Sequence, residues 1–367
     1  MKNTTPQLIK EELHKALGQL DSFESCALLN YPDYLNLGDH LIWLGTVMYL
    51  TDVLKTKIKY ASSIADFSPT VMEEKIGKAP IFLQGGGNLG DIWRVDQQFR
   101  EQIIAKYQDR PVIILPQSVF FSKPNNLQKT ANIFNSHPNL TIFVRDDRSY
   151  QIAQESFHKC RVIKSPDMAF QLLNLPGVST NCKSKSSILF LCRKDKELNQ
   201  EFSVNNVKIP NLVVEDWVSF PWVLGLRSQM VKRFATQMFR EVWQRGLMTP
   251  LEWIYRQKWQ SSYSNADKFN QMYNPFIHKL LWNFMSSGIY QFQQHQLVIT
   301  NRLHGHILCI LLGIPHVFLP NAYYKNESFY EAWTKDIPFC RFVKNTTQIE
   351  SAVQELLEIS KSGKLNV

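Results

Sequence analysis

Short runs of apolar and β-branched residues recur along this chain, and segments with helical spacing separate them. The runs begin at Ser25 (SCALLNY), Pro80 (PIFLQ), Pro111 (PVIILPQ), Thr141 (TIFVR), Ser187 (SILFLC), Asn211 (NLVV), Gln296 (QLVIT) and His316 (HVFL). Strands that alternate with helices form parallel sheets with helices on both faces. The pattern therefore predicts an α/β fold of two doubly wound, Rossmann-like units in tandem.

The length of the chain supports two units, because 367 residues exceed the usual size of one hydrophobic core. The polar stretch LPGVSTNCKSKS separates the two groups of runs. We predict an N-terminal Rossmann-like domain over residues 1–178, a C-terminal Rossmann-like domain over 179–345, and a C-terminal helix over 346–367. Two such domains face each other across a cleft at the carboxyl ends of their strands, where ligands of these sheets usually bind.

Charge and cysteine content narrow the function classes. The chain has 41 Lys and Arg against 32 Asp and Glu, a net charge of +9 that favours anionic partners. No recognised nucleic-acid motif occurs, so we expect no nucleic-acid partner. The six cysteines are dispersed, without a CxxC pair or a short-spaced Cys/His cluster, which predicts no metal site and no disulfide framework.

The chain has neither the apolar core of a signal peptide nor an apolar run that would span a bilayer, so a cytoplasmic protein is expected.

The tetrapeptide Asn-Leu-Gly-Asp occurs twice, at residues 36–39 and 88–91, each time shortly after a predicted strand. In the first copy Asp39 is suited to cap the next helix, which would leave free backbone N–H groups at an anion-binding or sugar-binding edge. The second copy follows three glycines, residues 85–87, whose backbone can approach a ligand closely. Both copies could instead be simple strand-to-helix turns, but their repetition favours a function.

The run VITNRLHGHILCILLGIP has the pattern of a strand followed by a helix. Thr300 or Asn301 is predicted to cap a helix that ends near Gly313. Arg302 and His304 then stand in its first turn, at the positive end of the helix dipole. A guanidinium suits an oxyanion and an imidazole can exchange a proton near neutral pH, so the two predict an acid and anion clamp.

Other charged residues near strand ends are further candidates. Arg193 follows a very apolar strand, so the chain direction should deliver it into the cleft as an anion-binding group. Arg145 and Asp167 also follow strands, and each could instead be a solvated charge at the rim. His306 lies two positions after His304, about 200° around a helix, and is predicted to be structural.

Seven segments occur in the order of the motifs of a known family. They are NLGD near the first strand, QGGGNLGD, PQS (116–118), RDDRS (145–149), SPDMAF (165–170), TNRLHGHI (300–307) and NAYYKNESFYEAW, which ends at Trp333. This ordered set covers about residues 25–335 and resembles the polysaccharide pyruvyltransferase family. Residues 195–295 carry no recognisable family motif, which leaves the acceptor undefined.

The resemblance implies a GT-B-like fold, phosphoenolpyruvate as the donor with no separate cofactor, and a carbohydrate acceptor that is polymeric or lipid-linked. It implies that pyruvate becomes a ketal on a sugar while phosphate is released, and that the donor site lies in the C-terminal domain. The predicted catalytic residues are His304 and Arg302; the donor-binding residues are Arg193, Leu303, Gly85, Gly86, Gly87 and Asn88; the acceptor-binding residues are Asn36, Asp39, Asp91 and Arg145.

Two other function classes stay open from the sequence. A GT-B glycosyltransferase with a nucleotide-sugar donor would use the same cleft and glycine-rich loops. A non-catalytic protein that binds acidic polymers would use the positive net charge, although anionic substrates account for that charge as well.

Residues 217–259 interleave aromatic side chains with arginines and lysines. Basic amphipathic helices of this kind can lie in a membrane interface, which would suit a lipid-linked acceptor and a peripheral location at the inner face of the membrane. The alternative is a pair of core-packing helices with a solvated basic face.

Overall fold

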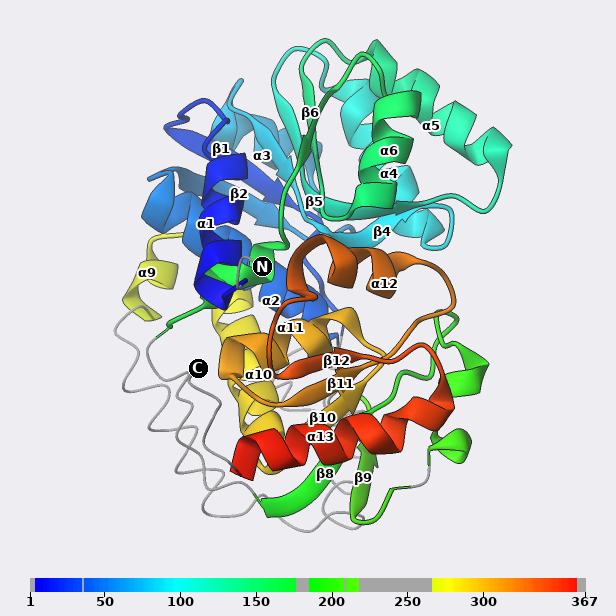
Figure 1. Ribbon diagram of the computed structural model, residues 1–367. Helices are drawn as coiled ribbons and strands as arrows, with labels where there is room; N and C mark the ends of the chain where they lie inside the picture. Colours follow the sequence, from blue (N-terminus) through cyan, green and yellow to red (C-terminus); the bar gives the residue numbers. More distant parts are fainter. Residues whose placement is uncertain (1–3, 35, 176–184, 208, 218–265, 362–367) are drawn as a thin grey trace, which may run out of the picture.

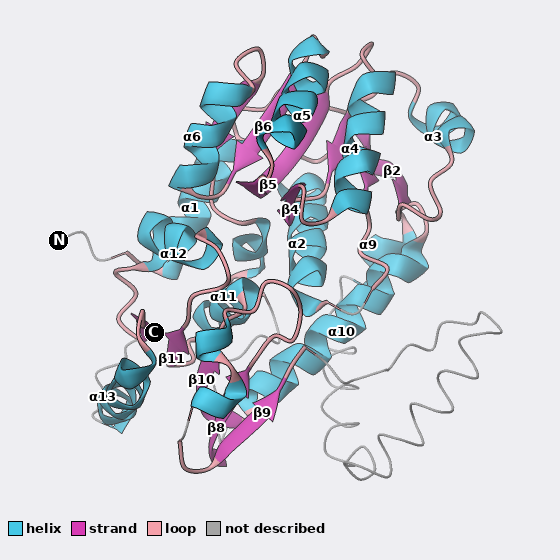
Figure 2. Cartoon of the chain, turned by 90° about the vertical axis from the view of Figure 1, so that its right-hand side faces the viewer, coloured by secondary structure: helices cyan, strands magenta, loops and turns pink. Residues whose placement is uncertain are grey.

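The computed structural model describes residues 4–34, 36–175, 185–207, 209–217 and 266–361 (Figures 1 and 2). Within these ranges the chain forms two parallel sheets with helices packed on them, which confirms the α/β prediction. All but the first residue of the basic aromatic segment 217–259 lies outside the described ranges. The domain boundaries at 178 and 345 stay predictions.

The first sheet has seven strands. They are β1 (Ser25–Leu29), β2 (Lys57–Ser62), β3 (Ile81–Leu83), β4 (Gly86–Gly90), β5 (Val112–Phe120), β6 (Leu140–Val144) and β7 (Arg161–Lys164). The order is β2-β1-β3-β5-β6-β7, with β4 also beside β5, and every pairing is parallel. The chain passes from β1 to one side and returns to the other side at β3, so a topological switch point lies between these strands.

The second sheet has five strands. They are β8 (Lys185–Leu191), β9 (Leu212–Glu215), β10 (His295–Thr300), β11 (His316–Phe318) and β12 (Cys340–Phe342). The order is β12-β11-β10-β8-β9, again all parallel, and the switch point lies between β8 and β10. The segments that leave the four switch-point strands carry both glycine-rich motifs, Arg193 and the RLHGH run. The topology therefore brings the predicted site together.

Helices cover the two sheets (Figure 1). Those of the first half are α1 (Pro6–Leu17), α2 (Leu37–Met48), the π-helical turn η1 (Tyr49–Val53), α3 (Pro69–Ile76), α4 (Arg94–Lys106), α5 (Pro124–Ser136), α6 (Asp147–Ser156) and the 3₁₀ turn η2 (Met168–Leu172). The later ones are η3 (Gln200–Phe202), η4 (Val204–Asn206), α9 (Ala266–Asn270), α10 (Pro275–Gln293), α11 (Leu303–Leu312), α12 (Lys325–Phe329), η5 (Tyr330–Thr334), η6 (Thr346–Gln348) and α13 (Ile349–Lys361). The C-terminal helix α13 packs on β10 and β11, in the second unit. None of the helices in the described ranges has the length and apolar character needed to span a bilayer.

A large hydrophobic cluster joins the two halves, since α2 packs against α10 and α11 between the sheets (Figures 1 and 2). Trp43 of α2 is fully buried there and donates a hydrogen bond from Nε1 to His278 Nδ1 of α10, at 3.1 Å. The segment around α12 and η5 also crosses to the first half, where Trp333 Nε1 donates to the Arg145 carbonyl at 2.8 Å. Packed side chains therefore fix the relative position of the two sheets.

The two tetrapeptide copies differ in structure. In the first, Asn36 and not Asp39 caps α2, because Asn36 Oδ1 accepts a hydrogen bond from the Gly38 N–H at 3.1 Å. Asp39 stands in the first turn of the helix instead. Of the second copy, Asn88–Gly90 belong to β4, which pairs with β5, so this copy is not a simple strand-to-helix turn. Gly90 adopts φ of +143° there, and a Cβ would clash with the Phe120 carbonyl.

Candidate active site

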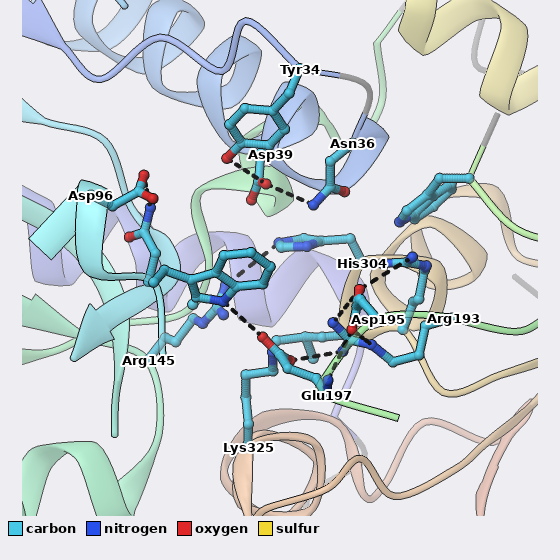
Figure 3. A pocket seen from close by; sticks show the side chains of 16 residues that line it. Tyr34, Asn36, Asp39, Asp96, Arg145, Arg193, Asp195, Glu197, His304 and Lys325 are labelled. Carbon is cyan, nitrogen blue, oxygen red and sulfur yellow. Dashed lines mark hydrogen bonds and ion pairs between the residues drawn. The ribbon is translucent and has the colours of Figure 1, made fainter. Parts of the chain in front are cut away.

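A cavity of about 380 Å³ lies beyond the carboxyl ends of the switch-point strands of both sheets (Figure 3). It is lined by Tyr34, Asn36, Asp39, Gly87, Asn88, Trp93, Asp96, Arg145, Arg193, Asp195, Glu197, Trp217, Arg302, Leu303, His304 and Lys325. A volume of this size suits a small-molecule substrate. Most predicted site residues therefore meet here; the exceptions are Gly85, Gly86 and Asp91.

Gly85 and Gly86 do not line the cavity. A Cβ on Gly85 would lie 2.6 Å from the Pro116 carbonyl oxygen, so the missing side chain lets this backbone approach β5. Gly86 has φ of +134°, and a Cβ there would lie 3.6 Å from Asp39 Oδ1. Their predicted role as donor contacts does not match this placement, whereas Gly87 does line the cavity.

Asp91 also lies away from the cavity. Its carboxylate accepts hydrogen bonds from the N–H groups of Ser122 (2.8 Å) and Lys123 (3.0 Å) and from Asn126 Nδ2 (3.0 Å). It thus holds the turn that leads into α5, and its predicted acceptor role is not supported by its position. Of the second tetrapeptide, Asn88 is the residue that lines the cavity.

His304 is the second residue of α11, and Arg302 is the N-cap, one or two positions later than predicted. The imidazole is nearly buried, with 9% of the residue exposed. A Cβ built on Gly38 would lie 2.4 Å from His304 Nδ1. The α2 backbone therefore lies directly against the imidazole. Any side chain at position 38 would occupy the space that the imidazole now fills.

A buried ion pair stands behind this imidazole. Arg145 Nη1 pairs with Asp167 Oδ2, and His304 Nε2 lies 3.4 Å from the same oxygen and 3.5 Å from Arg145 Nη1. Burial would raise the pKa of Asp167, but the nearby charges of His304 and Arg145 and the hydrogen bonds that Asp167 accepts hold that pKa well below its ordinary value. A permanent negative charge thus lies beside His304.

The three cations that the second half contributes to the cavity lining are already paired with carboxylates. Arg193 Nη1 donates to Glu197 Oε2 at 2.8 Å, and Lys325 Nζ pairs with the same oxygen. Arg302 makes a two-bond pair with Asp216, with Nη2 2.8 Å from Oδ2. An anionic ligand would therefore share these cations with carboxylates or replace the carboxylates.

Burial and neighbouring charges shift the pKa values of Lys325 and Glu197. Desolvation lowers the pKa of Lys325 to about 8, although the neighbouring Glu197 opposes the shift. Glu197 behaves in the opposite way: burial would raise its pKa, but Lys325 and Arg193 lower it to about 2. Glu197 is accordingly a carboxylate at neutral pH, while Lys325 can lose its proton in mildly alkaline solution.

The wall of the cavity opposite these cations carries neutral and acidic groups. Figure 3 shows Tyr34, Asn36 and Asp39 on one side of His304, and Arg193, Glu197 and Lys325 on the other. Asp39 Oδ2 accepts hydrogen bonds from Tyr34 Oη (2.9 Å) and Asn36 Nδ2 (2.7 Å). Carboxylates, amides and hydroxyls offer the donors and acceptors that sugar hydroxyl groups need, and indole faces can pack on a sugar ring.

The sequence did not identify several cavity residues. Lys325 lies within the NAYYKNE segment. Asp167 was a sequence candidate; it does not line the cavity but pairs with Arg145 beside His304. Glu197 had a weaker signal, as one charge in the run RKDKE after Arg193. Trp93 follows the second tetrapeptide, and its Nε1 donates to Glu197 Oε1 at 3.2 Å across the cavity.

The topology also gathers His306, His316 and Cys340, whose Nδ1, Nε2 and Sγ atoms lie within 4.8 Å of one another in the buried core. Sequence spacing had indicated no such Cys/His cluster. His306 Nδ1 lies 2.7 Å from His316 Nε2, and His306 Nε2 lies 2.9 Å from Thr334 Oγ1. His316 Nδ1 lies 2.9 Å from the Ile314 carbonyl oxygen. These hydrogen bonds tie α11 to β11 and η5, which agrees with the structural role predicted for His306.

Residues 36–323 match the sequence profile of the family described as polysaccharide pyruvyl transferase. The chain belongs to this family. EpsO of Bacillus subtilis strain 168, whose name describes a pyruvyl transferase, is 28% identical over 344 residues, which cover 94% of this chain and 96% of that protein. Pyruvyl transferase 1 of Schizosaccharomyces pombe is 24% identical over 352 residues, with coverages of 92% and 76%.

A crystal structure of an uncharacterised Klebsiella pneumoniae protein has a similar fold, with a TM-score of 0.54 at 17% identity. The match covers 92% of this chain and 96% of that one. Membership of the polysaccharide pyruvyl transferase family makes this chain a transferase that acts on a carbohydrate.

Proposed function

We propose that the protein transfers pyruvate from phosphoenolpyruvate to two hydroxyl groups of one sugar, forming a ketal and releasing phosphate. The observation that carries this proposal is the position of His304, between a cationic wall and a hydrogen-bonding wall of one cavity. The two Rossmann-like units that meet there would act as the halves of a GT-B-like enzyme, with the donor on the second unit.

On the donor side, Arg302 and Arg193 would bind the carboxylate and the phosphate of phosphoenolpyruvate. The position of Gly87 is consistent with a binding site for a small anion, because a Cβ there would lie 3.2 Å from Arg145 Nη2 and 3.3 Å from Lys325 Nζ. The missing side chain keeps the space between these two cations open. Guanidinium groups bind such oxyanions with paired, charge-assisted hydrogen bonds.

The chemistry starts when protonated His304 gives a proton to the methylene carbon of phosphoenolpyruvate, which makes the central carbon electrophilic. One sugar hydroxyl then forms a C–O bond to this carbon and loses its proton. The bond to phosphate breaks, and its electron pair leaves with phosphate. The second hydroxyl attacks the same carbon and loses its proton, which closes the ketal.

The proton count balances without another reactant. Of the two hydroxyl protons, one restores the proton that His304 gave to the methyl group, and the other leaves with phosphate or solvent. We therefore propose that no cofactor and no metal ion takes part in the reaction. The enzyme supplies orientation and charge compensation.

On the acceptor side, Tyr34, Asn36 and Asp39 would bind the sugar that becomes modified, and Trp93 offers an aromatic face. The acceptor would be a polysaccharide repeat or a lipid-linked oligosaccharide. We propose a cytoplasmic enzyme that contacts the inner face of the membrane through residues 217–259, on the basis of their basic, aromatic sequence.

The test is to incubate the purified protein with phosphoenolpyruvate and a panel of glycans, and to follow phosphate release and product mass. We expect phosphate release that depends on the acceptor, together with the mass of one pyruvate ketal. Calorimetry with phosphoenolpyruvate and with nucleotide sugars separates this proposal from a glycosyltransferase. Binding and turnover of a nucleotide sugar alone would overturn it.

A further inference from the structure

Asp39 has one carboxylate oxygen without a partner. Its Oδ2 accepts both hydrogen bonds from Tyr34 and Asn36, whereas Oδ1 receives none from the described residues. The Asp39 backbone is held too, because its carbonyl accepts from Gln84 Nε2 at 3.0 Å. The result is a half-buried carboxylate on the cavity wall, held at Oδ2 and without a partner among the described residues at Oδ1.

Asp39 also lies near the proposed acid. Asp39 follows Gly38, whose backbone lies against the His304 imidazole, and the charges of Asp39 and His304 interact. Figure 3 shows Asp39 on the side of the cavity next to His304, so a substrate held beside the imidazole would lie near both groups. A general acid and a general base need this kind of arrangement around one reacting centre.

We propose that Asp39 is the general base that takes the protons of the attacking sugar hydroxyls, an inference that rests on the proposed function. As each hydroxyl oxygen forms its bond to the central carbon, its O–H bond breaks and the proton passes to Asp39 Oδ1. The first proton returns from Asp39 to His304, which has given its own proton to the methyl carbon. The second passes to the departing phosphate or to solvent.

Most other carboxylates of the cavity are engaged by cations. Asp195 binds Arg193 through both oxygens, and Glu197 binds Arg193 and Lys325. A carboxylate in such a pair is a weak base because the cations stabilise its charge. Asp39 makes no such pair among the described residues.

The competing candidate is Asp96, which also lines the cavity and has no cation partner in the part of the chain that the structure describes. Its Oδ1 accepts hydrogen bonds from Asn30 Nδ2 (3.2 Å) and Asn88 Nδ2 (2.8 Å). Burial raises the pKa of Asp39, and the like charge of Asp96 adds to this shift; His304, the Tyr34 hydroxyl and Arg145 oppose it. Asp96 thus makes Asp39 a stronger base and is the matched control for it.

The experiment compares Asp39→Asn with Asp96→Asn, in the full-length protein with phosphoenolpyruvate and an accepted glycan. Asp39→Asn should lower kcat by about a hundredfold or more, remove the acidic limb of the kcat–pH profile, and leave the dissociation constant for phosphoenolpyruvate nearly unchanged. Asp96→Asn should keep kcat within about tenfold and retain an acidic limb, shifted to lower pH because one negative charge near Asp39 is gone. Thermal unfolding confirms that both variants fold.

The outcomes distinguish a failure of the base assignment from a failure of the proposed function. If the wild-type enzyme forms a ketal and Asp39→Asn keeps its kcat and acidic limb, Asp39 is not the base and the proposed function stands. Loss of the limb in Asp96→Asn alone would assign the role to Asp96 instead. If the wild-type enzyme forms no ketal with any glycan, the proposed function fails and the base assignment fails with it.

Discussion

Gly38 of α2 and His304 of α11 are in direct contact across the two halves of the molecule. A Cβ at position 38 would lie 2.4 Å from Nδ1 and 2.8 Å from Cβ of His304. Gly38, the third residue of the first Asn-Leu-Gly-Asp copy, therefore leaves room for the imidazole of His304 in the RLHGH run. Two motifs that are 266 positions apart in the sequence, from residue 38 to residue 304, share one structural requirement.

Gly38→Ala should displace the imidazole, because α2 is packed too tightly to move away. We expect kcat to fall at least about tenfold and stability to drop by about 1–3 kcal/mol, the usual cost of overpacking. Phosphate release and denaturant unfolding measure the two effects.

Gly77→Ala is the control: its φ of +56° makes a side chain unfavourable, but no atom lies within 4 Å of the added Cβ. It should lower stability and leave kcat unchanged. Wild-type kcat in Gly38→Ala would show that the contact does not matter for catalysis.

His304→Gln keeps a polar side chain of similar length but removes the acid. We expect kcat to fall by about a hundredfold or more, as for loss of a general acid, with phosphoenolpyruvate still bound. His306→Gln on the same helix is the matched control. It loses hydrogen bonds to His316 and Thr334 and should cost about 1–3 kcal/mol of stability, with most of kcat retained. Near-normal ketal formation by His304→Gln would exclude His304 as the acid.

Asp167→Asn should destabilise the fold, because it leaves Arg145 buried without its charge partner. Removing one partner of a buried pair costs about 3–5 kcal/mol. The folded pKa of Asp167 is depressed, so the stability that it adds is present above its unfolded pKa, about 3.9, and is lost as pH falls below that value. The wild-type protein should therefore lose this increment of unfolding free energy below about pH 4, and the variant should lack it at every pH.

Unfolding curves at several pH values test this prediction. Asp147→Asn is the control, because Asp147 pairs with Lys164 at the surface with 63% of its side chain exposed. Exposed pairs contribute little, so this variant should match the wild-type protein. Equal stability of Asp167→Asn and wild type at neutral pH would contradict the argument.

The sequence predicted the sheets wherever a strand is a continuous apolar run. All eight such runs, from SCALLNY to HVFL, form strands of parallel sheets. The strands that were missed lack this pattern: β2 alternates with lysines, β7 reads RVIK, β12 reads CRF with an arginine at its centre, and β4 is GGNLG. β4 pairs because its glycines allow an unusual backbone beside β5, which no strand propensity expresses.

The sequence predicted which residues reach the cavity where position along the chain determines position in space. In a parallel sheet, a residue that follows a switch-point strand reaches the cleft, which identified Arg193 and His304 without a structure. The partners of these residues were hidden, because Glu197 and Lys325 are 128 positions apart and meet only in the folded chain. The same limit concealed the contact between Arg145 and His304.

Lys325 should make binding of the donor depend on pH. Its pKa is lowered to about 8, mainly by burial, with Arg193 and Arg145 adding to the shift and Glu197 opposing it. Below that pH the ammonium group is charged and can attract an anion; as pH rises through about 8 the charge is lost. The phosphate of the donor titrates near about pH 6 and adds no change in this range. The dissociation constant for phosphoenolpyruvate, measured by calorimetry between pH 6.5 and 9.5, should therefore rise about tenfold, the value of one charge-assisted hydrogen bond.

Lys325→Met provides the matched control, since methionine fills similar space without a charge. We expect weak donor binding at every pH and no step near pH 8, because the titrating group is absent. A step of the same size in this variant would assign the titration to another group. A flat wild-type profile would show that Lys325 does not contact the donor, and would leave Arg193 and Arg302 as the anion-binding pair.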